Sequence, residues 1–130
     1  MEVRAGIPSD YPEVQRILEQ CPGAAQWSPE GYEFLVAEEG KMLAGFLVWR
    51  FTAPDEIEIL NVAVDPLRRR TGVAKALLSG LPKAVVFLEV RESNLAARSL
   101  YRLAGFAELR LRPGYYRNPD EGAIVMRLQS

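Results

Sequence analysis

The chain has 130 residues, of which 48% are hydrophobic and 25% charged, and its formal net charge is −1. This balance is typical of a globular protein, and we expect one domain spanning residues 1–130. One cysteine and no histidine exclude an internal disulfide, a His-based triad and a protein zinc site, and they favour a reducing, cytoplasmic compartment. The sequence has no apolar run of about 18 residues, so we predict no membrane contact.

The first half of the sequence predicts strands and one helix. Residues 2–7 suit a short strand, and Asp10 begins a capping box. Val14, Ile17, Leu18 and Cys21 follow at helical spacing, so we expect them on the buried face of a helix. Further strands are predicted over residues 34–37, 42–51 and 57–64, with turns at 38–41 and 52–55.

The second half predicts alternating strands and helices. A helix is expected over 72–81, and the strand over 84–90 is apolar on both faces, which predicts a central strand covered on both sides. Ser93 or Asn94 can cap a helix that runs to Leu103. Strands over 106–111 and 123–128 enclose a turn-rich loop. This order predicts an α/β (α+β) fold with a mixed, mostly antiparallel sheet, helices on both faces, and strand 57–64 parallel to strand 84–90.

Charge is distributed unevenly along the chain. Residues 1–65 hold 4 basic and 12 acidic side chains, whereas residues 66–117 hold 11 basic and 3 acidic ones. Three consecutive arginines, 68–70, precede Gly72 where a strand gives way to a helix. A helix N-terminus, a glycine and arginines together favour an anion site, although a solvated turn would have the same composition. Nucleic acid is not expected, because the chain is acidic overall and this segment lacks interleaved aromatic residues.

The stretches NVAVDPLRRRTGVAKALL and FLEVRESNLAARSLYRLAGF resemble the GNAT superfamily of acetyl-CoA-dependent N-acetyltransferases. The words LEVRESN, LY and GF are most similar to the branch that acetylates alanine at the N-terminus of ribosomal proteins. The resemblance implies acetyl-CoA as the acetyl donor and a splayed pair of parallel strands around its pantetheine arm. It also implies two groups of cofactor contacts: the arm with Val62, Ala63, Val64 and Asn94, and the diphosphate with Arg69, Arg70, Thr71, Gly72, Val73, Ala74 and Lys75.

Acetyl transfer needs a group that accepts the amine proton and a group that protonates the leaving thiolate. Glu89 is the first candidate base, because it is the only charge in its strand and because the resembling branch has its base there. Glu58 is the rival. It lies in phase with Leu60 and Val62 and would otherwise line the substrate site. The resemblance implies Tyr101, about two turns into its helix, as the acid.

Three aromatic residues are candidates for the acceptor site. Tyr115 and Tyr116 are expected in a loop flanked by Gly, Pro and Asn, and Trp27 in an irregular segment. The region after Trp27 is shorter than is usual in the family. The expected acceptor is a protein N-terminal α-amino group, attacked directly in a ternary complex. A small-molecule amine and a non-catalytic CoA-binding domain are the alternatives, and we expect a monomer or a weak homodimer.

Overall fold

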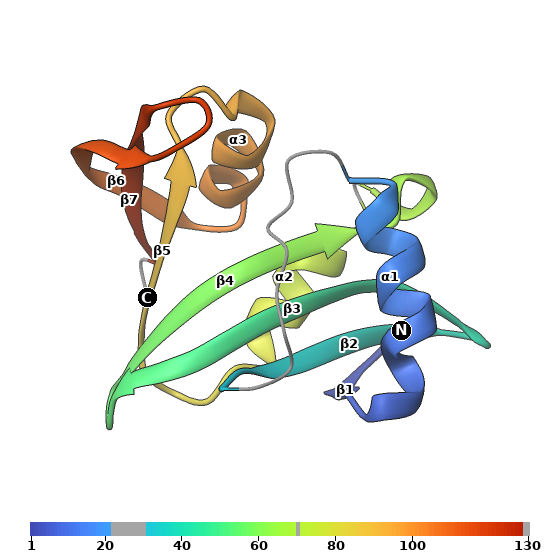
Figure 1. Cartoon of the computed structure of the whole chain (residues 1–130). Coiled ribbons are helices and arrows are strands. Elements are labelled where there is room, and N and C mark those ends of the chain that lie inside the picture. Colours follow the sequence, from blue (N-terminus) through green and yellow to red (C-terminus); the bar gives the residue numbers. More distant parts are fainter. Residues whose placement is uncertain (22–30, 70, 129–130) are drawn as a thin grey trace. The chain divides into compact units, whose positions relative to one another are not determined.

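The computed structural model describes residues 1–21, 31–69 and 71–128, and Figure 1 shows its elements. In chain order these are β1 (Glu2–Ala5), α1 (Tyr11–Glu19), β2 (Glu33–Glu39), β3 (Met42–Ala53), β4 (Glu56–Val64), α2 (Val73–Ser79), β5 (Val85–Arg91), α3 (Leu95–Leu103), β6 (Phe106–Tyr116) and β7 (Glu121–Leu128). Short 3-10 turns precede α1 and follow β4. No helix in this described part is long and apolar enough to cross a membrane.

The strand order is β1-β2-β3-β4-β5-β7-β6, with β4 and β5 as the parallel neighbours. The pairs β1–β2, β2–β3, β5–β7 and β6–β7 are antiparallel. This confirms the predicted mixed sheet. Contacts divide the chain into unit 1 (Met1–Arg50 and Ile59–Lys83) and unit 2 (Phe51–Glu58 and Ala84–Ser130). The splaying of the parallel pair and the single domain stay predictions.

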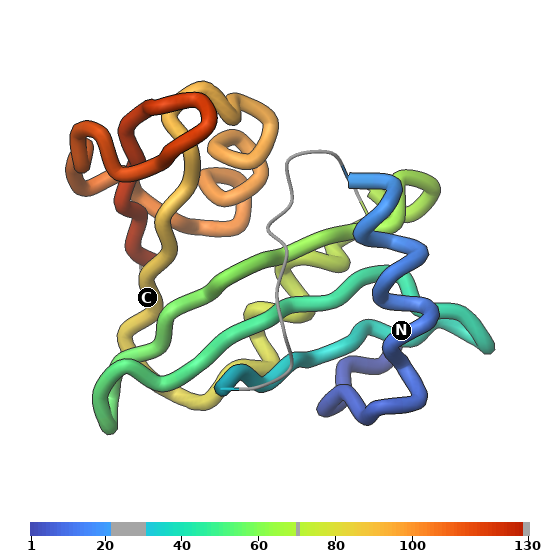
Figure 2. Tube along the Cα trace, in the orientation of Figure 1, coloured from blue at the N-terminus to red at the C-terminus, as the bar shows by residue number. Residues whose placement is uncertain are grey.

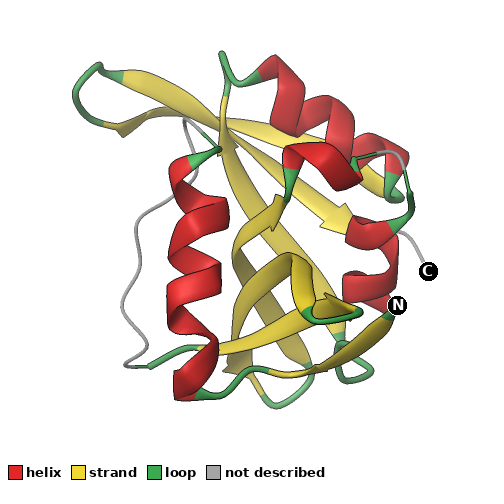
Figure 3. Cartoon of the chain, turned by 90° about the vertical axis from the view of Figure 1, so that its right-hand side faces the viewer, coloured by secondary structure: helices red, strands yellow, loops and turns green. Residues whose placement is uncertain are grey.

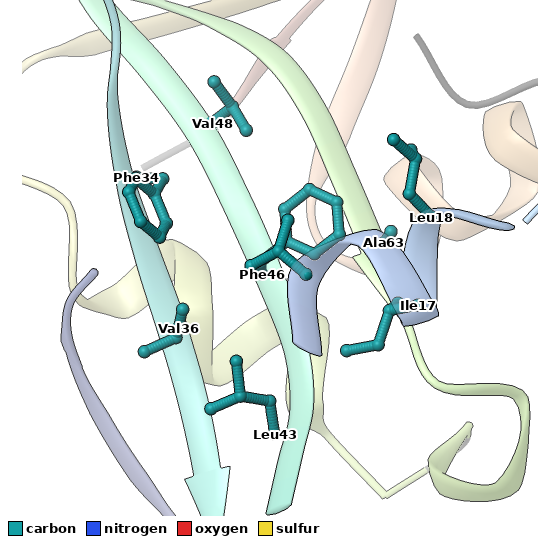
Figure 4. Close-up of a cluster of buried hydrophobic side chains, with 9 residues drawn as sticks. Ile17, Leu18, Phe34, Val36, Leu43, Phe46, Val48 and Ala63 are labelled. Carbon is teal, nitrogen blue, oxygen red and sulfur yellow. The ribbon is translucent and has the colours of Figure 1, made fainter. Parts of the chain in front are cut away.

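In unit 1, α1 packs its apolar face against β2 and β3. Val14, Ile17 and Leu18 are buried, as their helical spacing predicts. They meet a row of alternating strand residues, Phe34, Val36, Phe46 and Val48 (Figure 4). Full burial of one such side chain stabilises the fold by roughly 1.5–3 kcal/mol. Cys21 is partly buried and packs at the edge of this cluster.

Helix α2 covers the other face of the unit 1 strands (Figure 3). Gly80, just beyond α2, lies close to Leu35, whose side chain points away from that of Phe34 on β2. Gly45 on β3 lets α2 approach closely. A β-carbon there would come within 2.7 Å of the Ala63 carbonyl oxygen and 2.9 Å of Val73 Cγ1.

Asp10 differs from its predicted role as a helix cap. It stands just before α1, but its carboxylate makes no capping hydrogen bond to that helix. It accepts instead from the Ile7 N–H at 2.8 Å and from both terminal nitrogens of Arg4 at 2.9 Å. The two parallel bonds to a guanidinium combine opposite charges with a fixed geometry, which a single hydrogen bond from a helix N–H does not offer. The Arg4 guanidinium accordingly lowers the pKa of the Asp10 carboxyl.

Unit 2 contains β5, α3 and the β6–β7 hairpin, which Figure 2 follows from yellow to red. The predicted loop around the tyrosine pair is wrong, because β6 continues through Pro113 and Gly114 to Tyr116 and only residues 117–120 connect it to β7. β6 is an edge strand of the sheet. Pro113 has no backbone N–H to donate, but an edge strand has a side with no neighbouring strand, so no hydrogen bond of the sheet need be lost there.

Strand β5 is central in the strand order, as predicted, but its two faces differ in burial. Val86, Leu88 and Val90 are buried, whereas the residues between them are half-buried. Full coverage on both sides is therefore wrong for the face that carries Glu89.

Candidate active site

The corner between β4 and α2, in unit 1, is anchored by Asp65. This residue is only 4% exposed. Its N–H donates to the Ala44 carbonyl at 2.8 Å, and its carboxylate accepts from the Leu67 N–H at 3.0 Å and from Arg16 at 3.1 Å. These contacts lower the pKa of the Asp65 carboxyl, with the Leu67 hydrogen bond as the main cause. Asp65 thus fixes the turn to β3 and to α1.

The arginines of the corner have different surroundings. Arg68 is paired with Glu39. Arg69 is exposed, has no carboxylate partner among the described residues, and places Nη2 3.8 Å from Cys21 Sγ. Arg70 lies outside the described residues. The geometry therefore leaves Arg69 available to an external anion, whereas Arg68 is already neutralised.

The start of α2 offers backbone donors next to an open glycine. Gly72 has φ +83°, and a β-carbon there would have nothing within 4 Å. The first helical hydrogen bond runs from the Ala76 N–H to the Gly72 carbonyl at 2.9 Å. The N–H groups of Val73, Ala74 and Lys75 precede it and have no acceptor within the helix. Open space, oriented N–H groups and a nearby guanidinium suit a diphosphate.

The end of β4 leads into this corner. Val62, Ala63 and Val64 are buried. The Val64 carbonyl accepts from the Cys21 thiol at 3.7 Å, and the Ala63 carbonyl faces Gly45. The three residues are thereby held against neighbouring elements of unit 1.

In unit 2, strand register decides which side chains share a face. Glu89 pairs with Val125, and Arg91 pairs with Ala123, which also faces Arg112. Directly paired residues point to the same side of a sheet, so Glu89, Arg91 and Arg112 share one face.

The opposite face of the same strands packs against α3. Leu88 pairs with Met126, which also faces Glu108, and Arg98 of α3 binds Glu108 at 2.8 and 3.1 Å. Tyr101 of α3 is 8% exposed, and its ring lies edge-on to Phe106 with centroids 5.8 Å apart. Glu89 and Tyr101 therefore come from opposite faces of β5 and its neighbours.

Glu89 binds an arginine whose guanidinium lies over an aromatic ring. Its Oε1 accepts from Arg112 Nη1 at 2.8 Å, and its Oε2 is buried without a hydrogen-bond partner among the described residues. The Arg112 guanidinium lies 4.2 Å from the ring centroid of Tyr115, which meets Tyr116 edge-to-face at 5.1 Å. Burial, and secondly the Glu89 charge, raise the pKa of Tyr116 to about 12.

The other predicted site residues fall in three places. Asn94 caps α3 by accepting from the Ala97 N–H at 3.1 Å, as predicted. Glu58 is half-buried on β4 and belongs to unit 2. Trp27 lies outside the described residues. Arg112 is a site residue that the sequence does not predict. Residues 112–116 were expected in a loop, and no local pattern pairs this arginine with Glu89.

Asp65→Asn should destabilise the protein by about 1–2 kcal/mol at pH 7, because Arg16 loses the buried one of its two carboxylate partners and keeps only Glu13, while the Leu67 N–H keeps an oxygen acceptor. The lowered pKa makes this contribution complete above about pH 4, and it is lost as the pH falls further. Urea unfolding of both proteins at pH 7 and near pH 3 measures the difference, which should shrink in acid. Asp55→Asn, in an exposed turn, is the control and should change stability by less than about 0.5 kcal/mol. An Asp65 effect of equal size at both pH values would contradict the assignment.

The sequence is similar to a known protein family. Residues 5–106 match the profile of the acetyltransferase (GNAT) family. The chain is 36% identical over 129 residues to the [ribosomal protein bS18]-alanine N-acetyltransferase of Escherichia coli strain K12, covering 85% of this chain and 86% of that one.

Solved structures agree with the sequence match. The crystal structure of the ribosomal-protein-S18-alanine N-acetyltransferase from Escherichia coli superimposes with a TM-score of 0.75 at 31% identity, covering 98% of this chain and 92% of that one. A Bacillus subtilis acetyltransferase solved with CoA shares the fold, with a TM-score of 0.76 at 20% identity over 99% and 98% of the two chains. This chain belongs to the GNAT family and is an acyltransferase that uses acetyl-CoA.

Proposed function

We propose that this chain acetylates the α-amino group of a protein N-terminus. The similarity to a ribosomal-protein-alanine N-acetyltransferase over most of both chains carries the proposal. An α-amino group has a pKa of about 8, against about 10.4 for a lysine side chain, so its deprotonation at neutral pH requires only modest assistance. In the reaction the free amine attacks the acetyl carbonyl carbon, a C–N bond forms, the C–S bond breaks and the thiolate takes up a proton.

The corner in unit 1 is the proposed seat of the cofactor's diphosphate. The N–H groups from Thr71 to Lys75, including those of Gly72, Val73 and Ala74, would donate to it, with Arg69 and Arg70 as cationic partners. The open space at Gly72 and the uncommitted N–H groups support this fit. The backbone of Val62, Ala63 and Val64, together with Asn94, would bind the pantetheine arm. Acetyl-CoA supplies the activated acetyl thioester.

Glu89 is the proposed base. Arg112 holds one of its oxygens, which leaves the buried Oε2 to accept a proton from the amine. Tyr101, from the opposite face, is the proposed acid for the leaving thiolate. With the two groups on opposite faces, Glu89 would take the amine proton on the acceptor side. Tyr101 would donate a different proton to the thiolate on the thioester side. Glu58 remains the alternative base, and Tyr115, Tyr116 and Trp27 are the proposed lining of the acceptor site.

An acceptor screen tests the proposed function. The protein is incubated with acetyl-CoA and three kinds of acceptor: peptides with a free N-terminal alanine, the same peptides with a blocked N-terminus and an internal lysine, and small amines. Mass spectrometry should find acetylation on the free α-amino group. No acetylated peptide above background, or acetylation of lysine or small amines alone, would overturn the proposal.

Glu89→Gln should lower kcat by about 10²–10⁴-fold, because the amide cannot accept a proton. Tyr101→Phe should also lower kcat, because the phenol hydroxyl that would protonate the thiolate is lost. The ring and its packing against Phe106 are kept. Acetyl-CoA should still raise the Tm of both variants, since neither residue is proposed to bind the diphosphate. Glu58→Gln is the matched comparison. If it abolishes turnover while Glu89→Gln does not, the base is Glu58.

Gly72→Ala should raise the KM for acetyl-CoA, because φ +83° is strained for any residue with a β-carbon and the turn would relax away from the diphosphate. Gly31→Ala is the control, since Gly31 also has a positive φ, +77°, and open space around it but lies in the turn before β2. Both variants should lose about 1 kcal/mol of stability. Steady-state kinetics and urea unfolding separate the two effects. An equal KM rise in both variants would argue against a diphosphate at the corner.

A further inference from the structure

We propose that Arg91 is a positioning residue for the acceptor site, which it serves by holding the β6–β7 connection and the adjoining tyrosine pair in place. This inference rests on the proposed function, because it takes Tyr115 and Tyr116 as acceptor-site residues. Arg91 ends β5, two residues after Glu89, and its side chain shares the face of Glu89. The proposed chemistry gives it no proton to move.

The first support is the pair of carbonyl groups that Arg91 binds. Nη2 donates to the carbonyl of Arg117 at 2.9 Å, and Nη1 donates to the carbonyl of Pro119 at 3.1 Å. Both carbonyls belong to the 117–120 connection, whose residues are exposed. The planar guanidinium fork bridges two points of this short segment. Two further side-chain contacts of the segment are long and exposed: Arg117 Nη1 lies 3.8 Å from Asp120 Oδ1 and 3.5 Å from the Gly114 carbonyl oxygen.

The second support is the carboxylate that holds Arg91 itself. Glu121, at the start of β7, accepts from Arg91 Nη1 at 3.2 Å, from the Ser93 N–H at 3.0 Å and from the Ser93 hydroxyl at 2.9 Å. The Ser93 hydroxyl is the main cause of the lowered pKa of the Glu121 carboxyl. Ser93 directly precedes Asn94, the cap of α3. The same cluster therefore joins the connection to the turn that begins α3.

The third support is the contact with the tyrosine pair. The guanidinium carbon of Arg91 lies 4.4 Å from the ring centroid of Tyr116, a cation–π distance. Tyr116 also pairs in register with Glu121 and meets Tyr115 edge-to-face. Loss of Arg91 would free the connection and the Tyr116 ring together, while Glu89 and its Arg112 partner keep their own contact.

Arg98 provides a matched control within the same unit. It also makes three hydrogen bonds, two to Glu108 at 2.8 and 3.1 Å and one to the Glu92 carbonyl at 2.7 Å. These bonds fasten α3 to β6 and leave the 117–120 connection untouched. Arg98→Ala therefore removes the same number of hydrogen bonds without removing the proposed clamp.

Limited trypsin digestion tests the clamp without any use of enzymatic activity. The readout is cleavage after Arg117, identified by mass spectrometry of the new N-terminus at Asn118. Arg91→Ala should increase this rate about tenfold, because local opening governs cleavage, and Arg91→Lys should give an intermediate rate. Arg98→Ala should leave it within about twofold of the starting protein. Equal rates in all proteins would overturn the proposal.

Kinetics test the positioning role. Arg91→Ala should raise the KM for an N-terminal alanine peptide about tenfold, the effect of losing hydrogen bonds that order the site, while the KM for acetyl-CoA stays within about twofold. Arg91→Lys should restore part of the loss, and it carries the test if Arg91→Ala does not fold. A fall in kcat with unchanged peptide KM, or the same KM rise in Arg98→Ala, would overturn the role. If the starting protein acetylates no N-terminal peptide but the trypsin result is as expected, the proposed function fails and the clamp stands.

Discussion

The register of the β5–β7–β6 strands determines what unit 2 can do. With Glu89 opposite Val125 and Arg91 opposite Ala123, the charged residues of β5 share a face with Arg112, while Leu88 faces α3. A slip of one residue would reverse both faces, moving the carboxylate under the helix and the leucine into its place. The buried residues on the α3 side oppose such a slip, because charge without a partner is costly there. Hydrophobic packing on one face thus fixes the polar site on the other.

In unit 1 the backbone conformation of the turn between β4 and α2, rather than the pairing of charges, is the main constraint. Asp65 ties the turn after β4 to neighbouring elements, and Gly45 lets α2 come close enough for Val73 to be buried. Gly72 then adopts a positive φ, +83°, and a β-carbon there would have nothing within 4 Å, at the point where the first N–H groups of α2 have no acceptor within the helix. Of the arginines described there, Arg68 is already paired with Glu39. Three consecutive arginines in the sequence therefore do not mean three unpaired cations at the turn. The backbone shape of the turn is the stronger argument for a proposed anion site.

Local sequence patterns correctly predicted features that depend on neighbouring residues alone. The buried face of α1 follows from helical spacing, and the Asn94 cap follows from its side-chain chemistry. Side-chain pairings were not predictable in this way. Asp10 was expected to cap a helix but binds Arg4, and the partner of Glu89 on β6 was missed because Arg112 was expected in a loop. The first contact joins residues six apart and the second joins two strands, and neither is contained in the helix and strand patterns of a single sequence.

The most direct test of the account is a crystal structure with a bisubstrate analogue, in which CoA is joined through its acetyl group to the N-terminal nitrogen of an alanine peptide. The diphosphate should bind the N–H groups between Thr71 and Lys75. The peptide nitrogen should lie beside Glu89, the first peptide residue against Tyr115 and Tyr116, and the thioester sulfur position near Tyr101. A diphosphate bound away from the corner, or a peptide that runs along the α3 face, would contradict it.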